Sequence, residues 1–265
     1  MPTGRRCDTS SASRCSFTDA CVKWLAATGL LVVVVACGGS QSASDEVLVS
    51  AAASLIDAFG ESEAAFEASN PGVDVLLNFG SSSSLREQIL EGAPVDVFAS
   101  ANPSNMAQVI DAGASVRSTT FAINALRIAV PAGNPAGIAG LADFADPELL
   151  IGLCAAGVPC GDFARQSLEA AGVVPSLDTE EPDVRALLTK IEAGELDAGI
   201  VYVTDVLASG GVDGIEIPDE FNAVAEYHIA VMTESPNPGG AEAFVNFVLS
   251  AMGQAILQSY GFESP

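Results

Sequence analysis

The chain has 265 residues, 49% of them hydrophobic, and carries 34 Asp and Glu against 10 Lys and Arg, for a formal net charge of −24. This length and apolar content suffice for one large or two modest folded domains and exclude a disordered, highly solvated chain. The acidic balance argues against nucleic acid as a partner, because backbone phosphates are bound through Lys and Arg. A single His and the lack of paired-Cys spacing argue against a zinc site.

Residues 1–36 have the pattern of an export signal. Arg and Lys residues precede an apolar run from Trp24 to Ala36, which as a helix rises only about 20 Å and is too short to span a membrane. The run ends in Val-Val-Ala-Cys, which resembles a bacterial lipobox and implies cleavage before Cys37 and lipidation of its sulfur. A plain secretory signal with a coincidental Cys37 is the alternative. Residues 37–45 are small and polar, so we expect a flexible tether there.

Short apolar runs alternate with helix-period segments through the rest of the chain. We expect strands at 47–49, 73–77, 96–101, 126–130, 149–154, 198–203 and 228–232. We expect helices at 55–68, at 85–91, from Pro103, and at 161–171, 184–191 and 238–260. Continuous apolar strands between helices predict an α/β fold with largely parallel sheets covered on both faces.

Two such alternating sets indicate two lobes. We expect the chain to cross between them near Asn124 and near Tyr227. We therefore expect lobe 1 to comprise residues 46–124 and 229–265 and lobe 2 to comprise residues 125–228. The last helix returns to pack on the first lobe.

Cys154 and Cys160 are the cysteines that remain in the folded body after loss of the signal and lipidation of Cys37. Outside the cytoplasm a pair six residues apart can close a disulfide, and so short a loop contributes about 2 kcal/mol. Two buried free thiols are the alternative. Two cysteines alone cannot complete a tetrahedral metal site.

Small and polar residues open several of the expected helices, namely Ser54, Ser81–Ser84, Pro159-Cys160-Gly161 and Asp183. The unpaired N–H groups and the positive dipole end of a helix N-terminus bind anions, and small residues allow close approach. Ordinary N-capping by Ser and Asp is the alternative. Periodicity alone does not say whether these helix starts converge.

The sequence also contains a series of motifs in order along the folded body: AAASL at 51–55, GSSSSLREQILEGAPVDVFASAN at 80–102, VPCG at 158–161, DVRALL at 183–188, GIVY at 199–202 and YGF at 260–262. Together they resemble the molybdate-binding proteins of ABC importers, which are type II periplasmic-type solute-binding proteins. The resemblance covers nearly all of the expected mature chain. It implies a two-lobed α/β fold with mixed or parallel sheets, helices on both faces, and a cleft between the lobes that closes on a tetrahedral oxyanion.

The resemblance further implies that hydrogen-bond donors at five positions hold the anion: Ser54, Ser82, Cys160, Val184 and Tyr202. The two serines give hydroxyl and backbone N–H groups, Tyr202 gives its phenol, and the other two give backbone N–H groups. Cys160 stands where the family usually has Ala, which keeps the N–H contact and suggests that a disulfide to Cys154 holds this loop. Ser82 keeps the spacing to Leu85, with Ser81 or Ser83 as alternatives.

The expected function is capture of molybdate or tungstate outside the cell and delivery to an ABC permease. The ATPase is expected to be a separate subunit, because the chain has no Walker-type glycine loop. We expect a monomeric lipoprotein anchored at the outer face of the cell membrane or in the periplasm, with no cofactor. Arg127, Arg165 and Arg185 are either long-range helpers of the site or surface residues. Another oxyanion, such as sulfate or phosphate, or a small organic anion is the alternative ligand.

An enzyme, such as a serine hydrolase using Ser54, is a less favoured interpretation. A nucleophilic Ser needs a base, and the single His is His228 in an expected strand. No Gly-x-Ser-x-Gly motif surrounds Ser54, and Lys190 is the only Lys after the signal. We therefore do not expect an enzyme.

Overall fold

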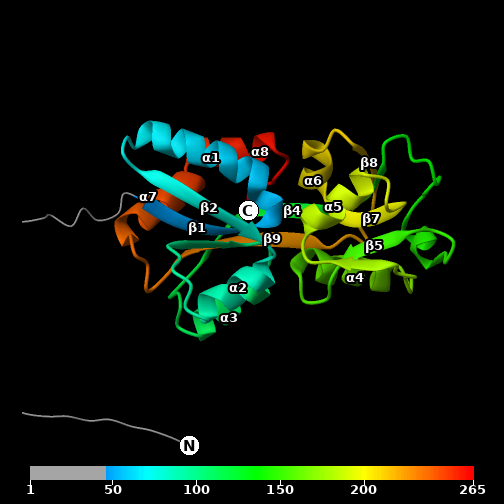
Figure 1. The fold of residues 1–265 in the computed structure, drawn as a ribbon, viewed down its shortest axis with the longest axis horizontal. Coiled ribbons are helices and arrows are strands. Elements are labelled where there is room, and N and C mark those ends of the chain that lie inside the picture. The colour runs from blue at the N-terminus through cyan, green and yellow to red at the C-terminus, as the bar shows by residue number, and fades with distance from the viewer. Residues whose placement is uncertain (1–45) are drawn as a thin grey trace, which may run out of the picture. The chain divides into compact units, whose positions relative to one another are not determined.

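The computed structural model describes residues 46–265, in which strands and helices alternate (Figure 1). The expected export signal at 1–36, the lipidation site Cys37 and the tether at 37–45 lie outside the described residues. Among residues 46–265, no single helix is long and apolar enough to cross a membrane. Helices α7 (Pro238–Leu249) and α8 (Ala251–Ser259) meet that criterion only as a pair, by length and composition, and bend by 61° at their junction.

A first sheet contains five strands in the order β2 (Asp74–Gly80), β1 (Glu46–Ala52), β3 (Val97–Ser100), β9 (Val224–Val231) and β4 (Thr119–Pro131). Strand β1 runs parallel to β2 and β3, whereas β9 is antiparallel to both β3 and β4. The parallel part confirms the expectation from the apolar strands. The antiparallel pairs make the sheet mixed.

A second sheet is built on the other end of β4. There β4 pairs with β7 (Ala198–Tyr202) and β8 (Val212–Glu216), and β7 continues to β5 (Ile151–Cys154) and β6 (Thr179–Glu181). Strand β4 is therefore shared, because its first half pairs with β9 and its second half with β7 and β8. This arrangement confirms the mixed α/β fold class.

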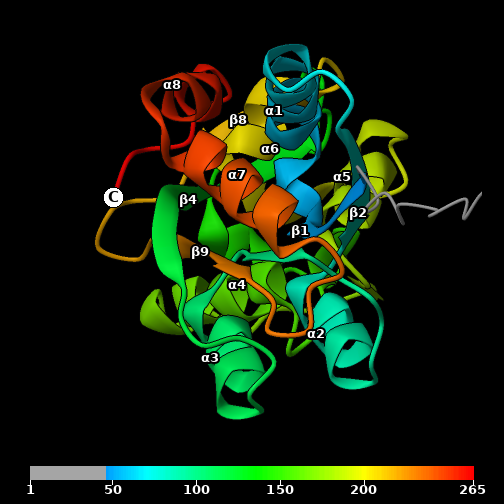
Figure 2. The ribbon, with the colours of Figure 1, turned by 90° about the vertical axis from the view of Figure 1, so that its left-hand side faces the viewer.

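Helices cover both faces of the first sheet. A 3-10 turn, η1 (Ala53–Leu55), leads into α1 (Ile56–Ser69), which lies with α7 and α8 on one face. Helices α2 (Ser82–Leu90) and α3 (Pro103–Asp111) lie on the other face, as Figure 2 shows. Aromatic side chains pack between α1 and α7, where the ring centroid of Phe66 lies 5.4 Å from that of Phe244.

The second sheet is covered in the same way. Helix α4 (Pro159–Ala170) lies on one side, and α5 (Val184–Glu192) and α6 (Val203–Ala208) lie on the other (Figure 1). A short 3-10 segment, η2 (Leu141–Ala145), precedes β5. The apolar face predicted for residues 184–191 is confirmed, because its Val, Leu and Ile side chains are all buried.

Two expectations about the last third of the chain are corrected. The single helix expected at 238–260 is wrong, because the chain breaks at Ser250, whose hydroxyl oxygen accepts the N–H of Gly253 and caps α8. The strand expected at 228–232 begins earlier, at Val224, because its first residues pair with β4. The lobe boundaries at 124 and 228 stay predictions.

Candidate functional site

A small cavity of about 20 Å³ lies where the starts of several helices meet. All five positions expected to donate to an anion line it: Ser54, Ser82, Cys160, Val184 and Tyr202. The remaining lining residues are Ala52, Ala53, Gly80, Ser81, Ala101, Val158, Pro159 and Asp183. The structure therefore brings together expected donors that are up to 148 positions apart in the chain, from Ser54 to Tyr202. Periodicity alone did not establish that they converge.

The positions around the cavity follow from strand and helix ends. Strands β1, β2 and β7 end next to it. Ser54 lies in the 3-10 turn that follows β1, and Ser82 is the first residue of α2, which follows β2. Cys160 and Val184 lie in the first turns of α4 and α5. First-turn N–H groups have no partner within their own helix, and they carry the positive end of the helix dipole. The lining is therefore rich in N–H and O–H donors.

Asp183 is the one charged residue among the described residues that line the cavity. Its carboxylate caps α5 by accepting the N–H of Ala186 at 2.9 Å. The carboxylate is thus used as an ordinary N-cap, as the alternative interpretation of this position predicted.

The serines at 81–84 differ in their hydrogen bonds. The hydroxyl oxygen of Ser82 accepts the N–H of Ala101 at 2.9 Å, so its own proton remains available for another acceptor. Ser81 caps α2 instead, because its oxygen accepts the N–H of Ser84 and its proton goes to the Ser84 hydroxyl. Ser83 does not line the cavity.

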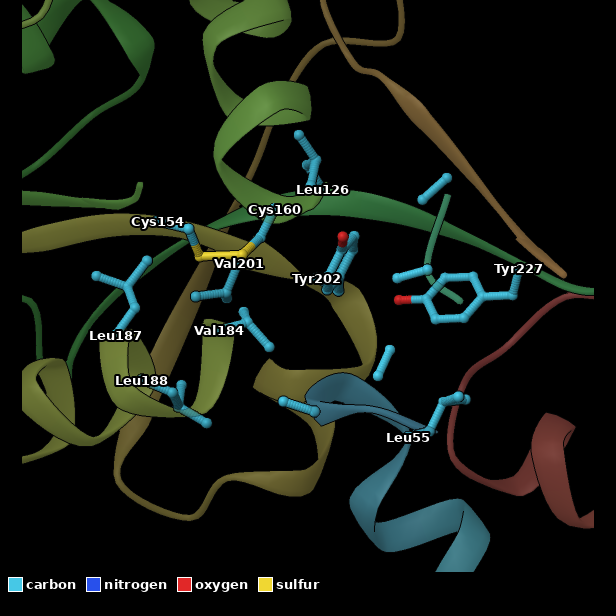
Figure 3. Close-up of a cluster of buried hydrophobic side chains, with 14 of the residues drawn as sticks. Leu55, Leu126, Cys154, Cys160, Val184, Leu187, Leu188, Val201, Tyr202 and Tyr227 are labelled. Carbon is cyan, nitrogen blue, oxygen red and sulfur yellow. A yellow bond between two sulfur atoms is a disulfide. The ribbon is translucent and has the colours of Figure 1, made fainter. Parts of the chain in front are cut away.

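Two buried tyrosines, Tyr202 and Tyr227, lie side by side (Figure 3). The Ser54 hydroxyl lies 2.8 Å from the hydroxyl of Tyr227, a residue that the sequence did not suggest for the site. The Tyr202 hydroxyl is buried and has no hydrogen-bond partner among the described residues. Burial raises the pKa of the Tyr202 phenol well above its ordinary value, so the group is a protonated donor at neutral pH.

Cys154 and Cys160 form a disulfide that joins the end of β5 to the first turn of α4 (Figure 3). The guanidinium of Arg165 adds two hydrogen bonds here, to the carbonyl oxygens of Cys154 at 2.8 Å and Gly161 at 3.0 Å. These links hold the loop that carries the Cys160 N–H.

The three arginines considered as long-range helpers all pair with carboxylates outside the cavity lining. Arg127 lies 3.2 Å from Glu216, Arg165 contacts Glu180, and Arg185 contacts Asp57. Arg185 follows Val184 in α5, whereas Asp57 lies in α1, so this pair connects elements that pack on different sheets. No arginine or lysine is among the described residues that line the cavity.

Asp205, near the start of α6, is a buried carboxylate just outside the cavity. Its Oδ2 accepts the N–H of Tyr202 at 3.1 Å, whereas Oδ1 has no hydrogen-bond partner among the described residues and lies 3.8 Å from Nε of Arg185. Burial raises the pKa of Asp205 to about 7, although the Arg185 charge opposes the shift. This group therefore changes its charge close to neutral pH.

We expect Asp205→Asn to remove part of the pH dependence of stability. With a pKa raised from 3.8 to about 7, folded Asp205 keeps a proton that the unfolded chain has released. Folding then takes up a proton, so the free energy of unfolding falls by about 1 kcal/mol from about pH 6 to 8. Urea unfolding across this range measures the effect. The exposed control Asp219→Asn should keep the wild-type slope, and an unchanged slope in Asp205→Asn would contradict the prediction.

The hydrolase interpretation finds no support in this geometry. The hydroxyl of Ser54 contacts Tyr227, whereas Nδ1 of His228 lies 3.4 Å from the Ser118 hydroxyl, and His228 does not line the cavity. Burial lowers the pKa of His228, so the ring is largely neutral at pH 7. A base positioned by a carboxylate next to the serine is what such chemistry needs.

Comparison with known proteins agrees with the fold and the motifs. Residues 47–263 match the family model described as bacterial extracellular solute-binding protein. The molybdate-binding protein ModA of Mycobacterium tuberculosis is 38% identical over 247 residues, which covers 89% of this chain and 95% of that protein. The Escherichia coli ModA is 31% identical over 253 residues and is covered to 98%.

Solved structures show the same fold at lower identity. The periplasmic molybdate-binding protein of Azotobacter vinelandii superposes with a TM-score of 0.72 at 20% identity, covering 83% of this chain and 99% of that one. The sulfate-binding protein SubI of M. tuberculosis gives the same TM-score and identity, covering 83% and 86%. This chain belongs to the bacterial extracellular solute-binding proteins, in the family of ABC-importer molybdate-binding proteins, which are transport proteins rather than enzymes.

Proposed function

We propose that this solute-binding protein captures molybdate or tungstate and delivers it to the permease of its ABC importer. One observation carries the proposal: the five positions expected to donate to an oxyanion all line one small cavity. The unpartnered Tyr202 hydroxyl supports it further, because a buried polar group without a partner is costly unless a ligand completes it.

The chemistry of the lining suits a fully deprotonated tetrahedral anion. Molybdate at neutral pH only accepts hydrogen bonds, and Ser54, Ser82 and Tyr202 bring hydroxyl donors to the cavity. Backbone N–H groups at Cys160 and Val184 add donors at the positive ends of the α4 and α5 dipoles. Hydrogen bonds to a charged partner contribute about 1.5–3 kcal/mol each, so a handful of them can offset dehydration of the anion.

The lack of Lys and Arg among the described lining residues also fits a carrier. Neutral donors hold the dianion without a permanent opposite charge, which allows it to be released to the permease. The strongly acidic surface acts at longer range, and physiological salt screens exposed charges over about 8 Å. The potential inside the cavity therefore depends on the nearby groups, namely the N–H dipoles and the Asp183 carboxylate that caps α5.

Among the serines, Ser82 is the proposed ligand of α2. Its oxygen already accepts the N–H of Ala101, so its proton remains available for a further acceptor, whereas Ser81 uses its proton on Ser84. Outside the described residues, the proposal retains lipidation at Cys37 and anchoring at the outer face of the membrane. We further propose that the protein works as a monomer with a permease and a separate ATPase subunit.

Calorimetric titration of the purified protein with molybdate, tungstate, sulfate and phosphate tests the proposed function. We expect 1:1 binding of molybdate and tungstate, with sulfate and phosphate at least about 100-fold weaker, because a smaller anion leaves some fixed donors unpaired. The triple variant Ser54→Ala/Ser82→Ala/Tyr202→Phe is the negative control. Equal affinity for sulfate would contradict the proposed ligand, and no binding of any oxyanion by the folded protein would overturn the anion site.

A further inference from the structure

Tyr227 lies next to the cavity but outside the proposed set of donors. It is on β9, is fully buried, and its Oη lies 2.8 Å from Oγ of Ser54. Ser54 lines the cavity, whereas Tyr227 does not. Tyr227 therefore influences a bound anion only through its neighbours in the lining, which are Ser54 at its hydroxyl and Tyr202 at its ring.

The Tyr227 ring is held in place by other aromatic rings. Its centroid lies 5.3 Å from that of Phe262, 5.9 Å from that of Tyr202 and 6.2 Å from that of Phe121, with edge-to-face geometry. Figure 3 shows the Tyr227 side chain beside Tyr202, with its hydroxyl end directed toward that side chain. Edge-to-face packing on several sides fixes the ring, so its hydroxyl has a defined position relative to Ser54.

The chemistry of the anion decides which hydroxyl donates in this pair. Ser54 has one proton, and an oxyanion can only accept hydrogen bonds. If Ser54 donates to Tyr227, it has no proton left for the anion. If Tyr227 donates to Ser54, the Ser54 proton is free for the cavity. Burial raises the pKa of Tyr227 above its ordinary value, so Tyr227 has its proton to give at neutral pH.

We propose that Tyr227 is a positioning residue of the anion site: its hydroxyl donates to Oγ of Ser54 and so directs the Ser54 proton into the cavity. Ser82 has the matching arrangement, because its oxygen accepts the buried N–H of Ala101. Each site serine thus accepts one fixed protein donor and keeps its own proton for the ligand. This role rests on the proposed oxyanion function.

A double-mutant cycle between Tyr227→Phe and Ser54→Ala tests the proposal, with molybdate as the titrant. Tyr227→Phe keeps the ring and removes the hydroxyl, so affinity should fall about three- to tenfold in the wild-type background. In the Ser54→Ala background the same change should leave affinity unaltered. Tyr260→Phe is the matched control, because its hydroxyl contacts Glu61 at the surface, and it should bind as the wild type does.

The outcomes separate three explanations. An equal loss in both backgrounds would show that Tyr227 acts through Tyr202, through the fold or on the anion directly, and it would overturn the positioning role at Ser54. No loss in the wild-type background would overturn it as well. If the wild-type protein binds no oxyanion at all, the proposed function fails first, and this role fails with it.

A measurement on the unmodified protein keeps the proposal testable if a variant does not fold. Neutron diffraction of the deuterated molybdate complex locates hydroxyl deuterium atoms. We expect the Tyr227 deuterium on the line to Oγ of Ser54 and the Ser54 deuterium directed at the anion. The reverse arrangement, with Ser54 donating to Tyr227, would refute the proposal.

Discussion

Tyr202→Phe should lower the affinity for molybdate by about 10- to 100-fold while leaving the ligand-free protein at least as stable as the wild type. The affinity loss is that of one hydrogen bond to a charged acceptor, about 1.5–3 kcal/mol. The stability effect has the opposite sign because the Tyr202 hydroxyl is buried without a partner among the described residues. Removing such a group relieves its desolvation cost.

Calorimetry gives the affinity of Tyr202→Phe, and thermal unfolding without ligand gives its stability. Tyr260→Phe provides the control, since its hydroxyl donates to Glu61 at the surface, and it should change neither quantity much. A Tyr202→Phe variant that binds molybdate as tightly as the wild type would remove the phenol from the proposed ligand set. A loss of ligand-free stability would mean that the hydroxyl has a structural partner.

Gly161→Ala should be the most destabilising single substitution near the site. Gly161 lies in the first turn of α4, where an added Cβ would come within 2.2 Å of the carbonyl oxygen of Ala155 and 2.4 Å of that of Cys154. The loop cannot easily move away, because the disulfide and Arg165 hold it. Relieving the overlap means displacing α4, at a cost of about 3 kcal/mol in the free energy of unfolding.

Urea unfolding of Gly161→Ala measures this cost, and titration with molybdate measures the accompanying loss of affinity as the Cys160 N–H is displaced. Gly60→Ala is the matched control, since Gly60 also lies in a helix but its added Cβ meets nothing within 4 Å. It should stabilise the protein by about 0.5–1 kcal/mol, because Ala has the higher helix propensity. Equal effects of the two substitutions would contradict the close packing at Gly161.

The elements that the sequence predicts well are those whose signal is local. The apolar face of α5 repeats at helical spacing from Val184 to Ile191, and every one of its apolar residues is buried. Helix α3 begins at Pro103 as expected, and the Asn102 side chain caps it. Such signals depend on a few neighbouring residues, so they can be recognised in the sequence without knowledge of the tertiary structure.

The elements that the sequence missed depend on distant partners. The first half of β4, Thr119–Ala125, is a strand because it pairs with β9, about 100 residues further along the chain. The six-residue helix α6 and the three-residue strand β6 are too short to show a period. The break at Ser250 depends on one side-chain cap within an otherwise helical pattern.

The candidate site likewise contains residues that the sequence predicts and one residue that it does not. Motif resemblance supplied the five donor positions, and the helix starts explained why small polar residues stand there. Tyr227 was missed because it opens no helix. The alternation of Ala225, Tyr227 and Ile229 on β9 predicts that these side chains are buried, but the contact with Ser54 spans 173 positions in sequence and arises only in the folded chain.

A crystal structure of the molybdate complex, with the molybdenum located by anomalous scattering, will show whether the anion binds in this cavity. We expect one strong peak in the cavity between the starts of α2, α4 and α5, with anion oxygens at hydrogen-bond distance from the hydroxyls of Ser54, Ser82 and Tyr202. Backbone N–H groups of Cys160 and Val184 should complete the shell. A molybdenum peak outside this cavity, at full occupancy, would show that these residues are not the anion site.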